Sequence, residues 1–230
     1  MHKNSNTHGF LKDVVDVRQI EALAEALLQL HMEHRRITYL PDLQKLFPDV
    51  TLLINKRIYE KSCQLLAEPV LNLENVELHY MPANSVPIPC HQDNFYHCIP
   101  GGRGVKILIP LTELNPRNGA LCFLDCDSSI GVLSHQSSNI PNFSAYIEDK
   151  QIKRLGASVT EYNYRLGDAS YHLLNSIHFS NGNTTKFPTA FIVFRYQPIG
   201  ALQCDAMLSR YRDCYDEHVS SLQLLQSSRR

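Results

Sequence analysis

The stretch PCHQDNFYH, residues 89–97, is the part of the sequence around which the rest of the chain is organised. It contains a His-x-Asp motif, and on an extended backbone residues two apart point to the same face. His91 and Asp93 are therefore expected to project side by side, where they could bind one divalent metal ion. A third protein ligand would complete a two-histidine, one-carboxylate set, which leaves further coordination positions open. The motif is short, so its meaning depends on the sequence that surrounds it.

The composition is that of a globular protein with a sizeable core. Of the 230 residues, 43% are hydrophobic and 20% are charged, which is ordinary for such proteins. The formal net charge of -1 gives no indication of nucleic acid or of an anionic membrane surface as a partner. No apolar run approaches the roughly 20 residues of a membrane span, and the N-terminal residues lack the pattern of a secretion signal. We therefore expect a cytoplasmic protein, and the seven cysteines, without a CxxC pair, fit reduced thiols.

The order of helical and strand patterns predicts helices packed on a β core. Apolar residues at helical spacing predict helices at 18–35 and at about 51–67, and a helical tail from about 208. Strand patterns fill the region between, at 76–80, 105–111, 120–124, 159–164, 171–178 and 189–196. Helices first and many short strands after them favour an α+β, mainly β fold in which helices cover an antiparallel barrel or jelly roll. We expect a single domain over 1–230, with a helical part at 1–70, a β core at 74–198 and a tail at 208–230.

Residues 125–156 are polar and rich in turn-forming residues. We interpret them as a long loop with short pieces of structure, and loops of that length are often functional. Together with the N-terminal helices, this loop is our candidate for the segment that closes over the substrate.

A second histidine, His178, lies in the run IHFSNGNTT at residues 177–185, after a Gly-Asp turn at 167–168. The elements HQD, NGALCFLD, GD and HFSNGNTT, in this order, resemble the phytanoyl-CoA dioxygenase-like branch of the iron(II)/2-oxoglutarate oxygenases. The resemblance covers about residues 74–198. It implies a double-stranded β-helix core of the jelly-roll or cupin-like type.

The same resemblance implies a catalytic centre in which His91, Asp93 and His178 bind Fe(2+), with 2-oxoglutarate and O2 as cosubstrates. It implies C–H hydroxylation or a similar oxidation of a small molecule, with release of succinate and CO2. In related halogenases a small residue replaces the carboxylate, so the presence of Asp93 favours hydroxylation. His172 is a rival third ligand, because six residues along one strand would keep it on the same face as His178; the serine and asparagine that follow His178 favour His178.

The sequence departs from the family pattern at Thr189. The family carries an arginine eleven residues after the distal histidine, where it pairs with the far carboxylate of 2-oxoglutarate, and this chain has Thr189 there. Lys106 is our preferred replacement because it stands alone in an apolar strand, fifteen residues after His91. This spacing is similar to that of the strand lysine in asparaginyl-hydroxylase and JmjC-type relatives. The alternative for Lys106 is a side chain that reaches solvent.

Other residues are candidates to support the cosubstrate. Thr189, Tyr80 and Ser180 could each offer a hydroxyl group, whereas Arg195 lies about 20 Å beyond Thr189 along its strand. Two other classes of function stay open. One is a cupin-like metalloenzyme that does not use 2-oxoglutarate, as the missing arginine suggests, and the other is a non-catalytic ligand-binding member of the fold.

Overall fold

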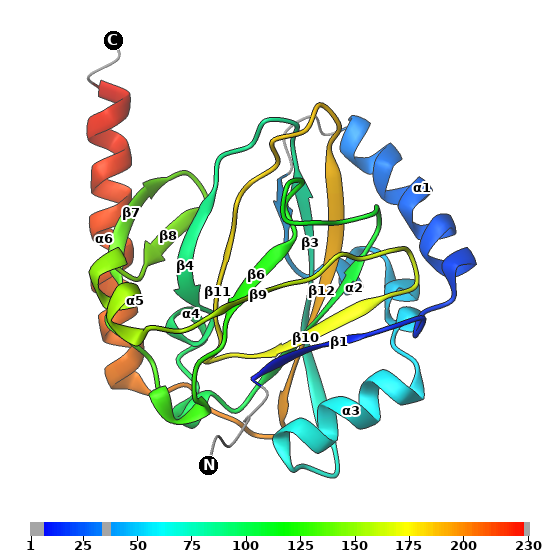
Figure 1. Cartoon of the computed structure of the whole chain (residues 1–230), viewed down its shortest axis with the longest axis horizontal. Coiled ribbons are helices and arrows are strands. Elements are labelled where there is room, and N and C mark those ends of the chain that lie inside the picture. The colour runs from blue at the N-terminus through cyan, green and yellow to red at the C-terminus, as the bar shows by residue number, and fades with distance from the viewer. Residues whose placement is uncertain (1–6, 34–37, 228–230) are drawn as a thin grey trace.

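Antiparallel strands form the centre of the computed structural model, which describes residues 7–33 and 38–227 of the chain (Figure 1). The strands are β1 His8–Leu11, β2 Tyr39–Leu40, β3 Leu71–Met81, β4 Ile88–Gln92, β5 Val105–Pro110, β6 Leu121–Leu124, β7 Gln136–Ile140, β8 Phe143–Tyr146, β9 Val159–Glu161, β10 Ala169–Leu173, β11 Ile177–Ser180 and β12 Thr189–Pro198. The helices are α1 Val17–Glu33, α2 Leu43–Leu46, α3 Lys56–Leu66, α4 Asn94–His97, α5 Asp149–Leu155 and α6 Asp205–Ser227, with short 3-10 turns at Pro48–Leu53, Pro100–Gly102 and Ser128–Ile130. The predicted α+β class is confirmed.

Two sheets and a separate pair of strands share these elements. The larger sheet has six strands in the order β1-β10-β5-β12-β3-β2, and the smaller has four in the order β4-β11-β6-β9. Strands β7 and β8 pair only with each other among the described residues. Neighbouring strands are antiparallel, as in β12 with β3 and with β5.

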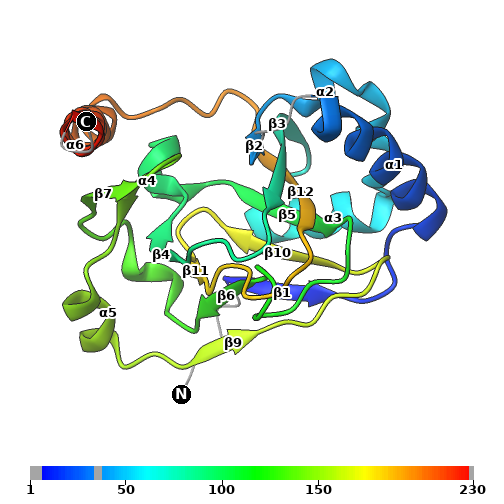
Figure 2. The ribbon, with the colours of Figure 1, turned by 90° about the horizontal axis from the view of Figure 1, so that it is seen from above.

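The side chains of β5 alternate between the two faces of the larger sheet, and both faces are buried. All six residues of β5 are buried. Val105, Ile107 and Ile109 belong to the large core that the N-terminal helices also enter, and Lys106 and Leu108 point to the opposite face because side chains alternate across a strand. Viewed from above, α1, α2 and α3 cover one face of the larger sheet (Figure 2). The opposite face of that sheet, away from these helices, therefore carries the buried side chain of Lys106.

The N-terminal helices differ from the prediction in their boundaries. The expected helix at 51–67 is divided into a 3-10 turn, Pro48–Leu53, and α3. Asn55 causes the division because its side chain accepts a hydrogen bond from the backbone N–H of Ile58 and so starts a new helix. The first helix, α1, begins at Val17, one residue before the predicted start, and the last residues of the prediction, 34 and 35, lie outside the described residues.

The expectation of one continuous strand over 171–178 is wrong. Tyr171 and His172 belong to β10 in the larger sheet, whereas His178 belongs to β11 in the smaller sheet. A turn separates them, in which the N–H of Ser176 donates to the carbonyl of Leu173 at 2.9 Å. Asn175 and Ser176, which lie in this break, are polar and favour turns, so the sequence did contain a signal for it.

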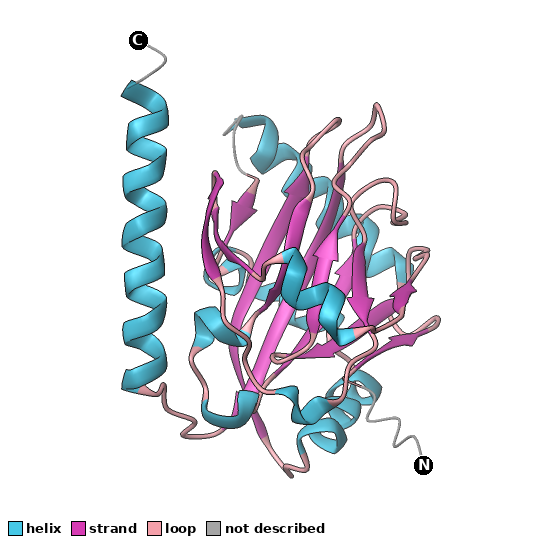
Figure 3. Ribbon diagram, turned by 60° about the vertical axis from the view of Figure 1, so that its left-hand side comes forward, coloured by secondary structure: helices cyan, strands magenta, loops and turns pink. Residues whose placement is uncertain are grey.

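The C-terminal helix lies on the side of the molecule opposite to α1. Helix α6 runs beside β7 and β8 (Figure 1), and Figure 3 shows it along the flank of the strands. The residues at 125–156 contain short pieces of structure, as expected, namely β7, β8 and α5. No helix in the described part of the chain is both long and apolar enough to span a membrane.

Candidate metal centre

The two sheets bring His91, Asp93 and His178 together. His91 on β4 and His178 on β11 are directly opposed partners of one strand pair. Asp93 follows the end of β4 and caps α4 with helical backbone angles, φ -57° and ψ -32°, so the expectation of an extended backbone at this residue is wrong. Its carboxylate nevertheless faces both imidazoles, and one ligand atom from each of the three residues lies within 4.8 Å of the others.

The hydrogen bonds of the two histidines leave the correct nitrogens available for a metal. The Nδ1–H of His91 donates to the carbonyl of Pro89 at 2.9 Å, and that of His178 donates to the carbonyl of Ser176 at 3.1 Å. In each neutral ring the Nε2 atom therefore keeps its lone pair. Burial lowers the pKa of both histidines, and His91 lowers that of His178 further. Two neutral imidazoles and one carboxylate fit the donor set of a divalent transition metal.

Asp93 is held by two further side chains. Its Oδ1 accepts a hydrogen bond from Lys106 Nζ at 3.1 Å, and its Oδ2 accepts one from His172 Nε2 at 2.8 Å. Burial by itself would raise the pKa of Asp93, but Lys106 and His178 hold it well below its usual value. His172, the rival third ligand, thus binds the carboxylate in this structure. Such contacts to a ligating carboxylate fix its orientation and tune its affinity for metal.

Lys106 is buried and lies between two carboxylates. Besides Asp93, its ammonium contacts Glu77 Oε2 on β3 at 3.3 Å. Its side chain is 9% exposed, so the alternative of a lysine that reaches solvent is wrong. Burial opposes the charge of Lys106, and the two carboxylates raise its pKa; Lys106 in turn lowers the pKa of Glu77 against the effect of burial. The sequence analysis did not identify Glu77.

The other candidate residues lie at different depths of the fold. Tyr80 and Ser180 line the same cavity as the metal ligands, and Ser180 Oγ donates to the carbonyl of Gly119 at 3.2 Å. Thr189 is buried, and its hydroxyl donates to the carbonyl of Asn118 at 2.6 Å. Arg195 is the direct strand partner of Lys106, and its guanidinium donates to Gln197 at 2.9 Å.

The cavity that contains the three candidate ligands has a volume of about 820 Å³. Its walls include side chains that the sequence analysis did not select, among them Glu77, His79, Phe143, Tyr211 and Tyr215. Glu77 and His79 occupy alternate positions of β3 and therefore face the same side as each other. This alternation, visible in the sequence VELHY, was the signal that could have identified them.

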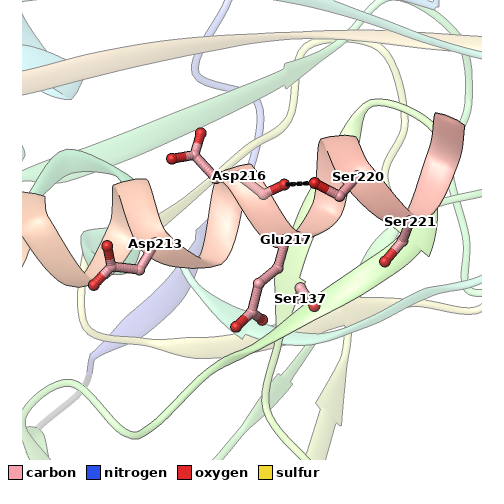
Figure 4. Close-up of a pocket in the computed structure, with 6 residues that line it drawn as sticks. All are labelled: Ser137, Asp213, Asp216, Glu217, Ser220 and Ser221. Atoms are coloured by element: carbon pink, nitrogen blue, oxygen red, sulfur yellow. Dashed lines mark hydrogen bonds between the residues drawn. The ribbon is translucent and has the colours of Figure 1, made fainter.

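A second hollow lies between α6 and β7 (Figure 4). Asp213, Asp216 and Glu217 line it together with three serines, and Ser220 Oγ donates to the backbone carbonyl of Asp216 at 2.8 Å. It shares no residue with the His-Asp-His cluster. A group of carboxylates on a helix is explained by solvation, so the metal centre is the candidate functional site.

The family model for phytanoyl-CoA dioxygenase (PhyH) matches residues 10–189, which is more than half of the chain. The chain belongs to the phytanoyl-CoA dioxygenase family. The match includes His91, Asp93 and His178 but ends before α6 begins. No curated protein matches the sequence.

Solved structures with the same fold agree with the assignment to the phytanoyl-CoA dioxygenase family. EctD from S. alaskensis in its apo form is 19% identical with a TM-score of 0.68, over 86% of this chain and 75% of that chain. The epimerase SnoN in complex with Fe3+, alpha ketoglutarate and nogalamycin RO is 20% identical with a TM-score of 0.67, over 86% and 81%. The carbocyclase SnoK is 14% identical with a TM-score of 0.71, over 91% of both chains. The predicted cupin-like jelly roll is confirmed.

Proposed function

We propose that this chain is a non-haem iron(II)- and 2-oxoglutarate-dependent dioxygenase that hydroxylates a C–H bond of a small molecule. The observation that carries the proposal is the convergence of His91, Asp93 and His178, whose ligand atoms lie within 4.8 Å of one another while the Nδ1 atoms of both histidines are engaged in hydrogen bonds. Membership of the phytanoyl-CoA dioxygenase family supports it. Solved structures of this fold include EctD with bound Fe and EctD with 2-oxoglutarate and 5-hydroxyectoine.

In this proposal the three side chains hold the iron and the protein supplies its surroundings. Iron(II) with three protein ligands keeps coordination positions for a 2-oxo acid and for dioxygen, and supplies the oxidising chemistry. His172 and Lys106 orient the Asp93 carboxylate through the hydrogen bonds described above. The buried apolar and aromatic walls exclude bulk water, which limits side reactions at the reacting centre.

Lys106 is the proposed anchor for the far carboxylate of 2-oxoglutarate. Among the described residues that line the cavity, it is the only lysine or arginine. An ammonium group has three donors, and the bonds to Asp93 and Glu77 use two of them. The third remains for the cosubstrate. Tyr80 and Ser180 are proposed to help from the cavity wall, and Thr189 from behind it.

One observation favours the second candidate, a metalloenzyme of the same fold that does not use 2-oxoglutarate. The position of the family arginine is Thr189, whose hydroxyl already donates to the carbonyl of Asn118. The remaining cation, Lys106, already faces two carboxylates. A cosubstrate with two negative charges therefore meets less positive charge here than beside an arginine.

The experiment that separates the candidates is a test for 2-oxoglutarate turnover. The iron-loaded protein is incubated with 2-oxoglutarate and oxygen, and succinate is quantified with and without candidate substrates. We expect slow succinate formation without a substrate, and its loss in Asp93→Ala and Lys106→Ala. The matched control is Lys186→Ala, because Lys186 does not line the cavity. Equal succinate formation by Lys106→Ala would contradict the anchor, and none from the wild type would favour the second candidate.

A further inference from the structure

Helix α6 forms part of the wall of the cavity that contains the metal ligands. It begins at Asp205, whereas the family match ends at residue 189. Tyr211, Tyr215, His218 and Leu222 of α6 line the cavity, and their spacing of three and four residues places them on one side of the helix. A segment outside the family match therefore lines the cavity in which the proposed reaction would take place.

Contacts with the body of the protein hold α6 in this position. Cys214 packs with Phe95 and Ala145 in a small hydrophobic cluster. The imidazole of His218 is buried and donates from Nδ1 to the carbonyl of Ser138 on β7. Just before the helix, the backbone N–H of Cys204 donates to the carbonyl of Cys98 at 2.8 Å. The wall is thus built by the fold, without help from a ligand.

Aromatic rings connect this wall to a metal ligand. The ring centroid of His91 lies 6.1 Å from that of Tyr96, and Tyr96 lies 5.8 Å from Tyr211. Tyr211 lies 6.0 Å from Tyr215, which is 46% exposed at the rim. Phe143 meets the edge of His91 at 4.9 Å. One side of the cavity is therefore lined with rings from the metal centre to the surface.

The opposite side of the cavity is also aromatic. His79 on β3 stacks on Phe191 of β12, with centroids 4.9 Å apart and an angle of 7° between the planes. Tyr39 meets the edge of His79 at 5.2 Å. Flat rings favour partners that stack or that present an edge. The two lined sides leave a cavity of about 820 Å³ between them, which is within the usual range for small-molecule sites.

The charges of the cavity leave little attraction for an acidic substrate. Lys106 is the only lysine or arginine among the described lining residues, and it is bonded to Asp93 and Glu77. In the proposed function its remaining donor is used by the cosubstrate. We propose that α6 is the substrate-recognition wall of this enzyme, and that it takes a flat, uncharged, largely apolar ring system. This inference rests on the proposed function, which identifies the cavity as the site of the reaction.

Fluorescence binding of an uncharged aromatic probe tests the inference on the metal-free full-length protein. N-phenyl-1-naphthylamine fluoresces in apolar sites, and the chain has no tryptophan to interfere. We expect saturable one-to-one binding, and weaker binding of the sulfonated analogue 1-anilinonaphthalene-8-sulfonate. No saturable binding of the uncharged probe, or equal binding of the two probes, would overturn the proposed substrate class.

A matched pair of leucines tests the role of α6. Leu222 lines the cavity, whereas Leu224 does not and is 70% exposed. Leu222→Ala should weaken binding of the uncharged probe about fivefold, since apolar contact area is lost, and Leu224→Ala should leave the affinity within twofold. Tyr215→Ala provides a second cavity-facing variant, and circular dichroism checks the folding of each. Equal affinities for both leucine variants would overturn the role of α6.

Paramagnetic broadening locates the bound probe. With Mn(II) added, the proton signals of the probe should broaden in the wild type and sharpen again in His91→Ala. Mn(II) binding without broadening of the probe signals would place the probe outside the cavity and overturn the inference. Failure of the protein to bind Mn(II) would instead contradict the proposed function, while the leucine comparison would still test the wall.

Discussion

The lysine between two buried carboxylates gives the sharpest prediction for stability. Lys106 contacts Asp93 at 3.1 Å and Glu77 at 3.3 Å, and the three side chains are 9%, 8% and 4% exposed. Replacement by methionine keeps the length of the side chain and removes its charge. Two carboxylates then remain buried without their cation, although His172 and His79 still contact them.

The expected loss of stability in Lys106→Met is large. Removing one partner of a buried ion pair costs about 3–5 kcal/mol, against a total stability of about 5–15 kcal/mol for a typical domain. The double variant Lys106→Met with Glu77→Gln should lose less than Lys106→Met, because the second change removes one uncompensated charge. Saturating Mn(II) should restore part of the loss, since the ion binds the folded state and neutralises Asp93.

Urea unfolding of the metal-free proteins, followed by circular dichroism, measures these differences. The pH dependence supplies an independent check of sign. In the wild type the pKa values of Asp93 and Glu77 are lowered in the folded state, so their contribution is present above the unfolded value near 4 and is lost as the pH falls further. Without Lys106, the largest influence that lowers the pKa values of Asp93 and Glu77 is lost and both values should rise, so lowering the pH from 7 to 5 should stabilise Lys106→Met relative to the wild type.

Two results would refute this reasoning. One is a loss below about 1 kcal/mol in Lys106→Met, which would resemble an exposed ion pair. The other is a double variant less stable than Lys106→Met itself, because it would show that Glu77 stabilises the fold without its cation.

Three further predictions follow from single residues. His172→Ala should weaken Co(II) binding about 10–100-fold, because the bond that orients Asp93 is lost; an unchanged affinity by titration would contradict this role. Gly182→Ala should destabilise the protein by more than about 1 kcal/mol, because φ is +73° and the added Cβ would lie 2.4 Å from the carbonyl oxygen of Ser85. Gly200 has a similar φ of +75° but open space around it, so Gly200→Ala measures the cost of the backbone conformation without the steric clash. Equal melting temperatures of the two variants would refute the steric argument. Burial lowers the pKa of His135 to about 4, so the contribution of the neutral imidazole to stability is complete above about pH 6.5 and is lost as the pH falls toward 4. His135→Gln should therefore make the free energy of unfolding less dependent on pH between these values. An unchanged pH dependence in this variant would exclude His135 as its source.

The sequence predicted those parts of the site that depend on local pattern. The isolation of Lys106 in an apolar strand selected it as a buried, paired cation, and the order of motifs selected His91, Asp93 and His178. The two-residue period of strands predicts that Gln92 faces away from Asp93, and its amide donates to the carbonyls of Gly131 and Asn175.

Features that depend on the meeting of distant segments were not accessible in the same way. His172 and His178 were assigned to one strand, although the chain changes sheets between them and the polar pair Asn175 and Ser176 marks the turn. The partnership of Glu77 with Lys106 joins β3 to β5, which are not adjacent in the sheet. The placement of α6 against the cavity depends on Cys214 and His218 meeting β7, β8 and α4, and no local pattern encodes those contacts.

The visible spectrum of the anaerobic protein tests the central claim most directly. Iron(II) and then 2-oxoglutarate are added to the wild type and to His91→Ala. A weak charge-transfer band at about 500 nm in the wild type, absent from His91→Ala, is expected if the two histidines and Asp93 hold iron with the cosubstrate bound through two atoms. Absence of the band from wild-type protein that has bound iron would contradict the use of 2-oxoglutarate and favour the metalloenzyme of the same fold that does without it.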